Sequence, residues 1–499
     1  MVGRSATADG SVITSHTADG GYRTWMAISP HRTNAVGGKT KIYDGRMFTR
    51  SPDDERRLKV AGEIPEAPES FAFLDTAYPA INEHQLALGE TTVVGRMELR
   101  NTNGVFKIEE LERLMLERCK TARQAIRLAD ELTREYGYGD YGECLTIADT
   151  KEVWQFEILG ATKKHLGAVW AAARIPDDHV GVSANVLRIG EIDLNNADYF
   201  MASSNVMSLA MELRWWNPTN GPFKFYKAYS WKKANCGPRE WRVLSLAAPS
   251  LNLDPNAVEL PFSVKAEKKV SVREVMGWFR DTYKNTPLDT TPRVSAPDRK
   301  GAEVPSLLVS PWMFDDLKSV FNSLKTNSAP RHYNIPNNTT SYSTVMQLRS
   351  WLPDPIGGIV WMGFDNPAQT CRIPLYCGIS DLPPSFKVSS QNGFTAKSAA
   401  WAFRRAARLS QLAWGKTRAA TEHLISDIED RALEELPSVE RTWTELQAKN
   451  PERARSFLTA YCNDFAMAAT QRYWDFGDDL WDAFAFDFSQ TIEERKQYR

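Results

Sequence analysis

The stretch from residue 144 to residue 174 reads CLTIADTKEVWQFEILGATKKHLGAVWAAAR, and it decides the fold class. Three strand-like runs fill it, at residues 144–148, 152–158 and 167–174, and only short polar turns separate them. Parallel neighbours would need a long crossover between strands, whereas antiparallel strands can follow one another directly. The stretch therefore predicts an antiparallel sheet and argues against alternating βαβ units.

The N-terminal residues contain an internal repeat of four letters. TADG occurs at residues 7–10 and again at 17–20, and SVITSH lies between them at 11–16. SVITSH is β-branched and alternating, and Asp-Gly is a strong signal for a tight turn. We therefore expect strand and turn to alternate from the very start of the chain.

Helical patterns dominate two parts of the chain. At residues 108–136 apolar residues recur at helical spacing with charges between them, and GYGDYG at 137–142 ends the pattern. After QNG at 391–393 the pattern stays helical. Successive helices with polar breaks are predicted there, at residues 401–414, 417–436, 437–449 and 451–474.

Strands and loops account for most of the remaining sequence. A second strand group is predicted at residues 340–375, and the charged residues 51–63 are predicted to form a loop. Residues 286–306 are rich in Pro, Thr and charge, which indicates a long surface loop. The expected fold class is α+β, and the best candidate for a domain edge separates residues 1–395 from a C-terminal helical unit at 396–499.

Composition excludes several classes of protein. Hydrophobic residues make up 42% of the chain and charged residues 25%, which is ordinary for a globular protein. The 61 basic and 62 acidic residues give a net charge of -1, so no overall field favours nucleic acid. No apolar run approaches the roughly 18 residues of a membrane-spanning helix. The six cysteines include no CxxC pair and are expected to be free thiols, which leaves the compartment open.

Local motifs for cofactor chemistry are incomplete. GGKT at residues 37–40 resembles the end of a phosphate loop, but Thr33 stands where that motif needs glycine, so a turn is expected. No two histidines have a metal-ligand spacing, and GxSxG is absent. The 16 Trp and 16 Tyr would suit sugar stacking, although most lie in apolar patterns typical of a core. We expect neither a metal nor another cofactor.

Polar residues gather where two predicted strands begin or end. In INEHQLALGETT, at residues 81–92, four polar residues directly precede the apolar run LAL. Such groups are costly to bury unless they form hydrogen bonds, so they indicate either a structural network or a site. Asn185 follows the strand-like residues 180–182, where an asparagine can cap a turn or donate its amide to an oxyanion.

Several segments together resemble one known family. They are VGRSATADGSVITSHTADG at 2–20, INEHQLALGETT at 81–92, EVWQFEILG at 152–160, GAVWAAARIPDD at 167–178, SANVLRIGEID at 183–193, CGPREWRVLSL at 236–246 and GGIVWMGFDNPAQTCRIPLYCGI at 357–379. In this order they resemble the cysteine dipeptidases of the N-terminal-nucleophile (Ntn) hydrolase superfamily. These enzymes are related to secernins and, more distantly, to bile-salt hydrolases and penicillin V acylases.

The resemblance implies a fold, a substrate and a mechanism. The fold would be a four-layer αββα sandwich of two antiparallel sheets between helix layers, and residues 1–395 would form the catalytic domain. The substrate would be a dipeptide, hydrolysed without a cofactor. An N-terminal cysteine would attack the scissile carbonyl, and its own α-amino group, with a reference pKa near 8, would carry the proton.

The chain departs from the family pattern at the nucleophile. The resemblance places that cysteine about four residues before Met1, and the earliest cysteine in the chain is Cys119, inside a helical pattern. We expect a truncated or misplaced start, because the chain otherwise begins within a central strand. The alternative is a catalytically inactive relative that keeps the fold as a binding or regulatory protein.

The resemblance also assigns the supporting residues of the site. Asp19 would orient the nucleophile's amine, and Asn185 would hold the amine or the oxyanion. Arg239 would support the nucleophile, with Arg242 as the competing choice. His84, Glu90 and Thr91 are expected to face the substrate. His16 stands where relatives commonly have Arg or Tyr, so no role is assigned to it.

Other properties of the protein stay open at this level. The expected partner is a small peptide, with no nucleic acid and no membrane span, and a homo-oligomer is compatible with the sequence. Arg32, Arg96, Arg174 and Arg188 are all candidate partners for a substrate carboxylate. Localisation would be cytoplasmic or secreted, according to what precedes Met1.

Overall fold

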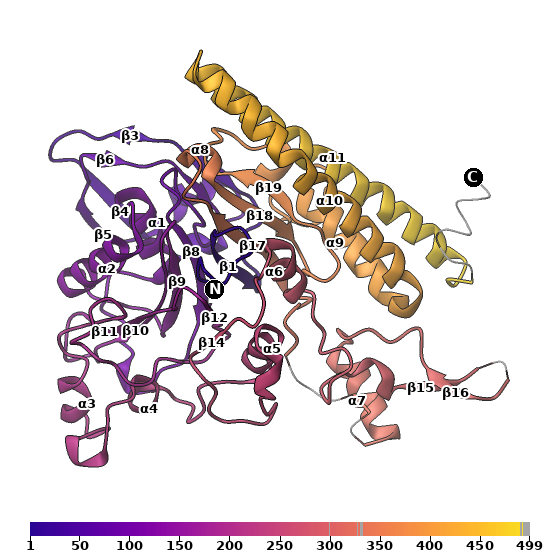
Figure 1. Ribbon diagram of the computed structural model, residues 1–499, viewed down its shortest axis with the longest axis horizontal. Coiled ribbons are helices and arrows are strands. Elements are labelled where there is room, and N and C mark those ends of the chain that lie inside the picture. The colour runs from indigo at the N-terminus through magenta and orange to yellow at the C-terminus, as the bar shows by residue number, and fades with distance from the viewer. Residues whose placement is uncertain (299, 327, 330–332, 490–491, 493–499) are drawn as a thin grey trace.

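The computed structural model describes residues 1–298, 300–326, 328–329, 333–489 and 492 of the chain, and two antiparallel sheets form its centre (Figure 1). The first sheet has the order β1-β17-β18-β19. Its strands are β1 (Val12–Asp19), β17 (Thr340–Leu348), β18 (Gly358–Phe364) and β19 (Ile373–Tyr376). This arrangement confirms the strands expected near the N-terminus and at residues 340–375.

The second sheet contains the stretch on which the fold class was predicted. Its order is β13-β11-β10-β9-β8, with every pair antiparallel. The strands are β8 (Ala87–Thr92), β9 (Glu143–Ala148), β10 (Val153–Gly160), β11 (Ala168–Arg174) and β13 (Phe200–Ala202). The antiparallel sheet predicted from residues 144–174 is therefore confirmed. Every residue of β10 is buried, because both faces of this strand are covered.

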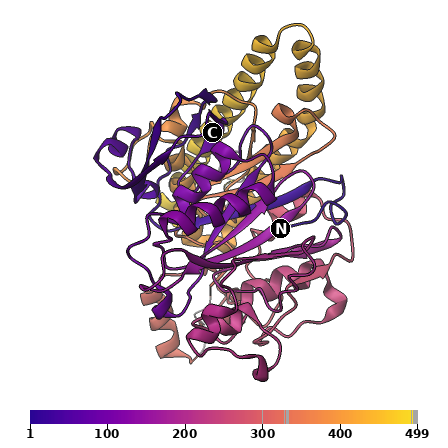
Figure 2. The ribbon, with the colours of Figure 1, turned by 90° about the vertical axis from the view of Figure 1, so that its left-hand side faces the viewer.

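Helices cover the sheets on two sides (Figure 2). Helix α2 (Ala122–Tyr136) lies against β9, β10 and β11, and α1 (Ile108–Arg118) packs beside it. The helices α9 (Ala399–Ser410), α10 (Trp414–Gln447) and α11 (Pro451–Ala485) lie against β18 and β19. The two sheets contact each other through β1, β8 and β9. The α+β class with antiparallel sheets and C-terminal helices is confirmed.

The first residues of the chain are part of the first sheet. Val2 pairs with Ile13 of β1 on one side and with Val180 of β12 (His179–Gly181) on the other. Strand β12 in turn pairs with β14 (Ser263–Lys265). The N-terminal segment thus occupies a strand position between β1 and β12, and its backbone pairs on both edges.

Shorter elements complete the described part of the chain. The N-terminal third adds β2 (Ala27–Ser29), β3 (Arg32–Thr33), β4 (Lys39–Asp44), β5 (Lys59–Pro65), β6 (Glu69–Ser70) and β7 (Phe73–Asp75). The middle adds α3 (Ser208–Glu212), α4 (Phe225–Tyr229), α5 (Pro238–Ala247), α6 (Val272–Trp278), β15 (Ser295–Pro297), β16 (Glu303–Pro305), α7 (Asp315–Leu324) and α8 (Asp354–Gly357). Within the described residues, no helix is both long and apolar enough to cross a membrane.

Three local predictions were wrong. The pattern at residues 108–136 forms two helices, because Thr121 caps α2 by accepting a hydrogen bond from the Gln124 N–H. Helix α10 runs through Pro437 without the predicted break, since Leu436 and Val439 on either side are buried in the core. Residues 51–63 are only partly a loop, because β5 begins at Lys59 and pairs with β4.

Candidate functional site

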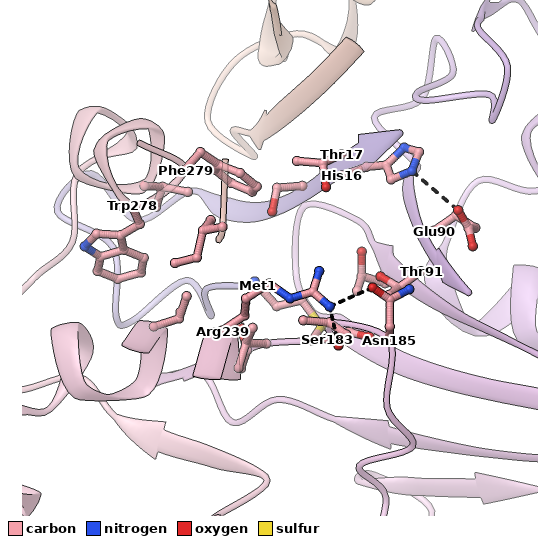
Figure 3. Close-up of a pocket in the computed structure, with 18 of the residues that line it drawn as sticks. Met1, His16, Thr17, Glu90, Thr91, Ser183, Asn185, Arg239, Trp278 and Phe279 are labelled. Atoms are coloured by element: carbon pink, nitrogen blue, oxygen red, sulfur yellow. Dashed lines mark hydrogen bonds and ion pairs between the residues drawn. The ribbon is translucent and has the colours of Figure 1, made fainter. Parts of the chain in front are cut away.

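A cavity of about 150 Å³ lies beside the C-terminal ends of β1 and β8 (Figure 3). The N-terminal segment, the loop after β12, and helices α5 and α6 complete its lining. A cavity of this size can hold a benzene-sized group, so it suits a small ligand. Five of the six predicted site residues line it, namely Asp19, Glu90, Thr91, Asn185 and Arg239.

Asn185 and Arg239 are joined by a direct hydrogen bond. Nη2 of Arg239 donates to Oδ1 of Asn185 at 2.8 Å and to the backbone oxygen of Ala184 at 3.1 Å. The Asn185 amide nitrogen donates to the Thr92 carbonyl at 2.7 Å, which ties the loop to the end of β8. Asn185 holds a positive φ of 63°, which asparagine tolerates better than most residues. The guanidinium of Arg239 points into the cavity (Figure 3).

Asp19 closes another side of the cavity at the end of β1. Its Oδ1 accepts a hydrogen bond from the Thr340 hydroxyl at 2.6 Å. A register shift in the pairing of β1 with β17 falls between Ala18 and Asp19. Such an irregularity changes the direction of the side chain at the strand end, which here is that of Asp19. Burial raises the pKa of Asp19, while Thr340, Arg239 and His16 act in the opposite direction.

The side chains of Glu90 and His16 lie next to each other in the lining of the cavity. Nε2 of His16 lies 3.5 Å from Oε2 of Glu90, and both side chains are almost fully buried. Oε1 of Glu90 accepts a hydrogen bond from the Thr92 hydroxyl at 3.2 Å. His16 also meets the rings of Tyr78 and Tyr342 edge-on. A residue to which the sequence assigned no role therefore belongs to the site.

A group of buried acids lies behind Glu90. Burial, together with the neighbouring Glu90, raises the pKa of Glu143 well above its ordinary value. Burial likewise raises the pKa of Glu112 on α1, and neither of its carboxyl oxygens has a hydrogen-bond partner. Neither side chain forms an ion pair with a cation among the described residues, and desolvation of the charged form is the main cause of both raised pKa values.

The opposite wall of the cavity is apolar. Val275, Trp278 and Phe279 come from α6 and the residue after it, and Val243 comes from α5. Ile335 adds to the same wall. Sequence analysis missed these residues, because an apolar helical pattern does not show which face of the helix will meet a cavity.

Met1 also lines the cavity. Its backbone nitrogen donates a hydrogen bond to the Gly181 carbonyl at 3.1 Å. The cavity lining therefore brings together the start of the N-terminal segment, the carboxyl groups of Asp19 and Glu90, and the guanidinium of Arg239.

Two of the residues considered from the sequence lie elsewhere. His84 lines a second cavity of about 410 Å³, where its Nδ1 is 3.5 Å from Oδ2 of Asp354. Arg242 pairs with Asp281 in a two-point ion pair at 2.7 and 2.9 Å and does not line the first cavity. The structure thus brings Arg239 to the site and leaves Arg242 outside it.

The cysteines and candidate metal ligands also lie apart from the site. All six cysteines fall within the described residues, and none of them lines the first cavity. Burial raises the pKa of each thiol above its ordinary value. In the part of the chain that the structure describes, no group of three or more His, Cys, Asp or Glu side chains is placed to hold a metal ion.

Comparison with known proteins identifies the family. The model of peptidase family C69 matches residues 1–427. A probable dipeptidase of Latilactobacillus sakei is 24% identical over 487 residues, which cover 93% of this chain and 90% of the relative. A probable dipeptidase of Salmonella dublin is 26% identical and covers 83% of this chain and 89% of its own length. Dipeptidase A of Lactobacillus helveticus is 21% identical, with 78% and 77% covered. The chain belongs to peptidase family C69, a family of cysteine dipeptidases, as its sequence motifs predicted.

Proposed function

We propose that the protein is a dipeptidase that works through an N-terminal cysteine nucleophile located before Met1. One observation carries the proposal: Asp19, Asn185 and Arg239 converge in the cavity that the N-terminal segment enters. These residues come from three distant parts of the sequence. The small size of the cavity and the dipeptidase names of the relatives support a short peptide as substrate.

The strand register supports this position of the nucleophile. Val2 pairs with Ile13 and with Val180, in both cases antiparallel. In an antiparallel pair, each residue toward the N-terminus on one strand lies opposite a residue further toward the C-terminus on the other. A residue about four positions before Met1 would therefore lie opposite Ala18 on β1 and opposite Asn185 beyond β12. Its amine would lie beside Asp19. Its side chain would share a face with those of His16 and Ala18, since cross-strand partners project to the same side.

Each supporting residue then has a defined task. The carboxylate of Asp19 orients the amine that takes the thiol proton. The thiolate attacks the scissile carbonyl, the C–N bond breaks, and the amine returns the proton to the leaving amino group. Water then hydrolyses the thioester. The guanidinium of Arg239, held by Asn185, supplies donors and positive charge on the side where the oxyanion develops.

The proposal includes the finer description of the fold. The contacts of α2 with the second sheet, of the two sheets with each other, and of α9–α11 with the first sheet support a four-layer αββα sandwich. We keep residues 1–395 as the catalytic domain and residues 396–499 as a helical extension packed on it. Buried side chains of that extension, such as Phe403 and Tyr473, belong to the main core cluster.

The N-terminus of the protein made by its natural host provides the first test. Intact mass and N-terminal sequencing should find a cysteine a few residues before Val2. Replacing that cysteine by alanine should then abolish dipeptide cleavage while the melting temperature stays unchanged. Unchanged cleavage by the alanine variant would refute the mechanism.

The alternative is an inactive relative that binds a small ligand without hydrolysis. Asp19, Glu90 and Arg239 line the cavity and can bind a small polar ligand without a nucleophile. A natural chain that begins at Met1, binds a dipeptide in this cavity and releases no amino acids would establish it.

A further inference from the structure

We propose that two copies of this chain associate through helix α7 (Asp315–Leu324), with the two helices packed antiparallel about a two-fold axis. The inference does not depend on the proposed function. It assigns an interaction surface to a part of the chain that lies outside the cavity, and it commits to a second copy of the same chain as the partner.

Helix α7 lies outside the two sheets and the C-terminal helices, together with β15 and β16 (Figure 1). A small separate core holds this part of the chain in place. Val294, Val309, Met313 and Ala329 are buried in that core, and Phe321 of α7 packs against them. No residue of α7 itself is buried. The helix is therefore attached by one side, and its other side contributes nothing to that core.

An apolar stripe runs along the exposed side of α7. Leu317, Val320 and Leu324 recur at the i, i+3 and i+7 positions that share one face of a helix. Their exposed fractions are 43%, 54% and 79%, respectively. Phe314, directly before the helix, is 72% exposed. Single exposed apolar side chains are ordinary on a protein surface, whereas a stripe of large ones indicates a contact surface.

The size of this surface fits a reversible dimer. Leu307 and Leu308, which precede the helix, are also more than half exposed. The largest apolar patch on an ordinary monomer is about 300–600 Å², and these six side chains together expose several hundred Å². Two copies that cover them would bury on the order of 1,000 Å² in total, which is the lower limit for a specific interface and typical of a weak one.

The charges of α7 favour an antiparallel partner. Asp315 and Asp316 begin the helix, and Lys325 follows its last residue. Lys318 pairs with Asp315 at 3.2 Å, whereas neither Asp316 nor Lys325 forms an ion pair with another described residue. A parallel copy would place Asp316 beside Asp316 and Lys325 beside Lys325. An antiparallel copy places Asp316 beside Lys325 twice, because a two-fold interface repeats each contact.

One register satisfies the stripe and the charges together. When the two-fold axis passes between residues 320 and 321, residue 317 of one copy lies opposite residue 324 of the other, and residue 316 lies opposite residue 325. Leu317 then packs on Leu324 twice, with an Asp316–Lys325 pair beside each contact. The apolar packing supplies most of the affinity, and the charge pairs at the rim set the direction.

Sedimentation velocity of the full chain at concentrations from about 0.5 to 50 µM tests self-association. We expect the weight-average mass to rise from that of one chain toward twice that mass, with a dissociation constant in the micromolar range. Leu317→Glu should raise the dissociation constant at least about tenfold, because it places a charge in the apolar contact. Leu194→Glu, at a half-exposed position in the loop before β13, is the matched control and should leave it unchanged.

Charge reversal tests the antiparallel register. Asp316→Lys and Lys325→Asp should each weaken self-association about tenfold, because each creates two like-charge contacts in a dimer. An equal mixture of the two variants should recover the mass of the wild-type sample, since a mixed dimer regains two attractive pairs.

Each contrary result overturns a defined part of the inference. A mass of one chain throughout the concentration range would overturn the proposal. Dimers that form equally well in wild type and Leu317→Glu would show that another surface makes the contact. A mixture of the two charge variants no heavier than either variant alone would overturn the register. Each variant should keep the wild-type melting temperature below the dissociation constant, which separates a lost contact from misfolding. None of these results depends on whether the protein cleaves dipeptides.

Discussion

The buried carboxyl of Glu109 should make the stability of the protein depend on pH in a measurable way. Glu109 lies in the first turn of α1, is 1% exposed, and has no hydrogen-bond partner for either oxygen. Burial, reinforced by the nearby Asp140, raises its pKa from 4.5 to about 8. The folded protein therefore keeps a proton that the unfolded chain releases above pH 4.5.

The sign and size of the effect follow from linkage. Between the two pKa values the folded state binds more protons, so the free energy of unfolding falls as pH rises. The slope is about 1.4 kcal/mol per pH unit, which amounts to about 4 kcal/mol between pH 5 and pH 8. Glu109→Gln removes the titrating group and keeps the shape. The variant should match the wild type near pH 5 and be more stable by about 4 kcal/mol at pH 8.

Urea unfolding followed by tryptophan fluorescence at pH 5, 6, 7 and 8 measures the difference. The other acids titrate in both proteins, so their contributions largely cancel in it. Glu131→Gln on the exposed face of α2 is the matched control and should change stability by less than about 0.5 kcal/mol at each pH. Parallel curves for Glu109→Gln and the wild type would show that Glu109 ionises normally, and would refute the reasoning.

Three further predictions concern the cavity and the thiols. Trp278→Ala removes part of the apolar wall and should weaken leucyl-glycine binding about tenfold in isothermal titration calorimetry, with less than about a twofold change for glycyl-glycine. Asn185→Ala releases Arg239 and should lower kcat/KM for dipeptide hydrolysis at least about tenfold, whereas the exposed Asn195→Ala should not. Because burial raises the pKa of all six thiols, iodoacetamide at pH 7.5 should label them in urea and leave the folded protein unlabelled over minutes. One rapidly labelled cysteine in the folded state would contradict this.

The fold was predictable where local pattern and tertiary environment agree. Residues 144–174 contain short β-rich runs and short turns, and that combination leaves antiparallel pairing as the simple solution. Pro437 shows the opposite case, because the local preference of proline predicts a break while burial of Leu436 and Val439 keeps the helix continuous. Local rules set expectations for an isolated segment, and packing overrides them when enough apolar surface is buried.

The site was predictable only in part, for a geometric reason. Asp19, Asn185 and Arg239 came from the family resemblance, since no local pattern links residues so far apart in the chain. His84 and Glu90 stand close together in one motif, but His84 lies in the turn before β8 and Glu90 lies within the strand. The two side chains line different cavities. Nearness in the sequence is therefore a poor guide to shared function where a turn meets a strand.

The stability prediction for Glu109 also bears on two other buried acids. Glu109, Glu112 and Glu143 have raised pKa values for the same reason, which is burial without a paired cation. If Glu109 instead ionised at its ordinary pH, the interior behind Glu90 would be more polar than its packing indicates. Glu112 and Glu143 are buried in the same region, so parallel unfolding curves for Glu109→Gln and the wild type would also count against the raised pKa values of these two acids.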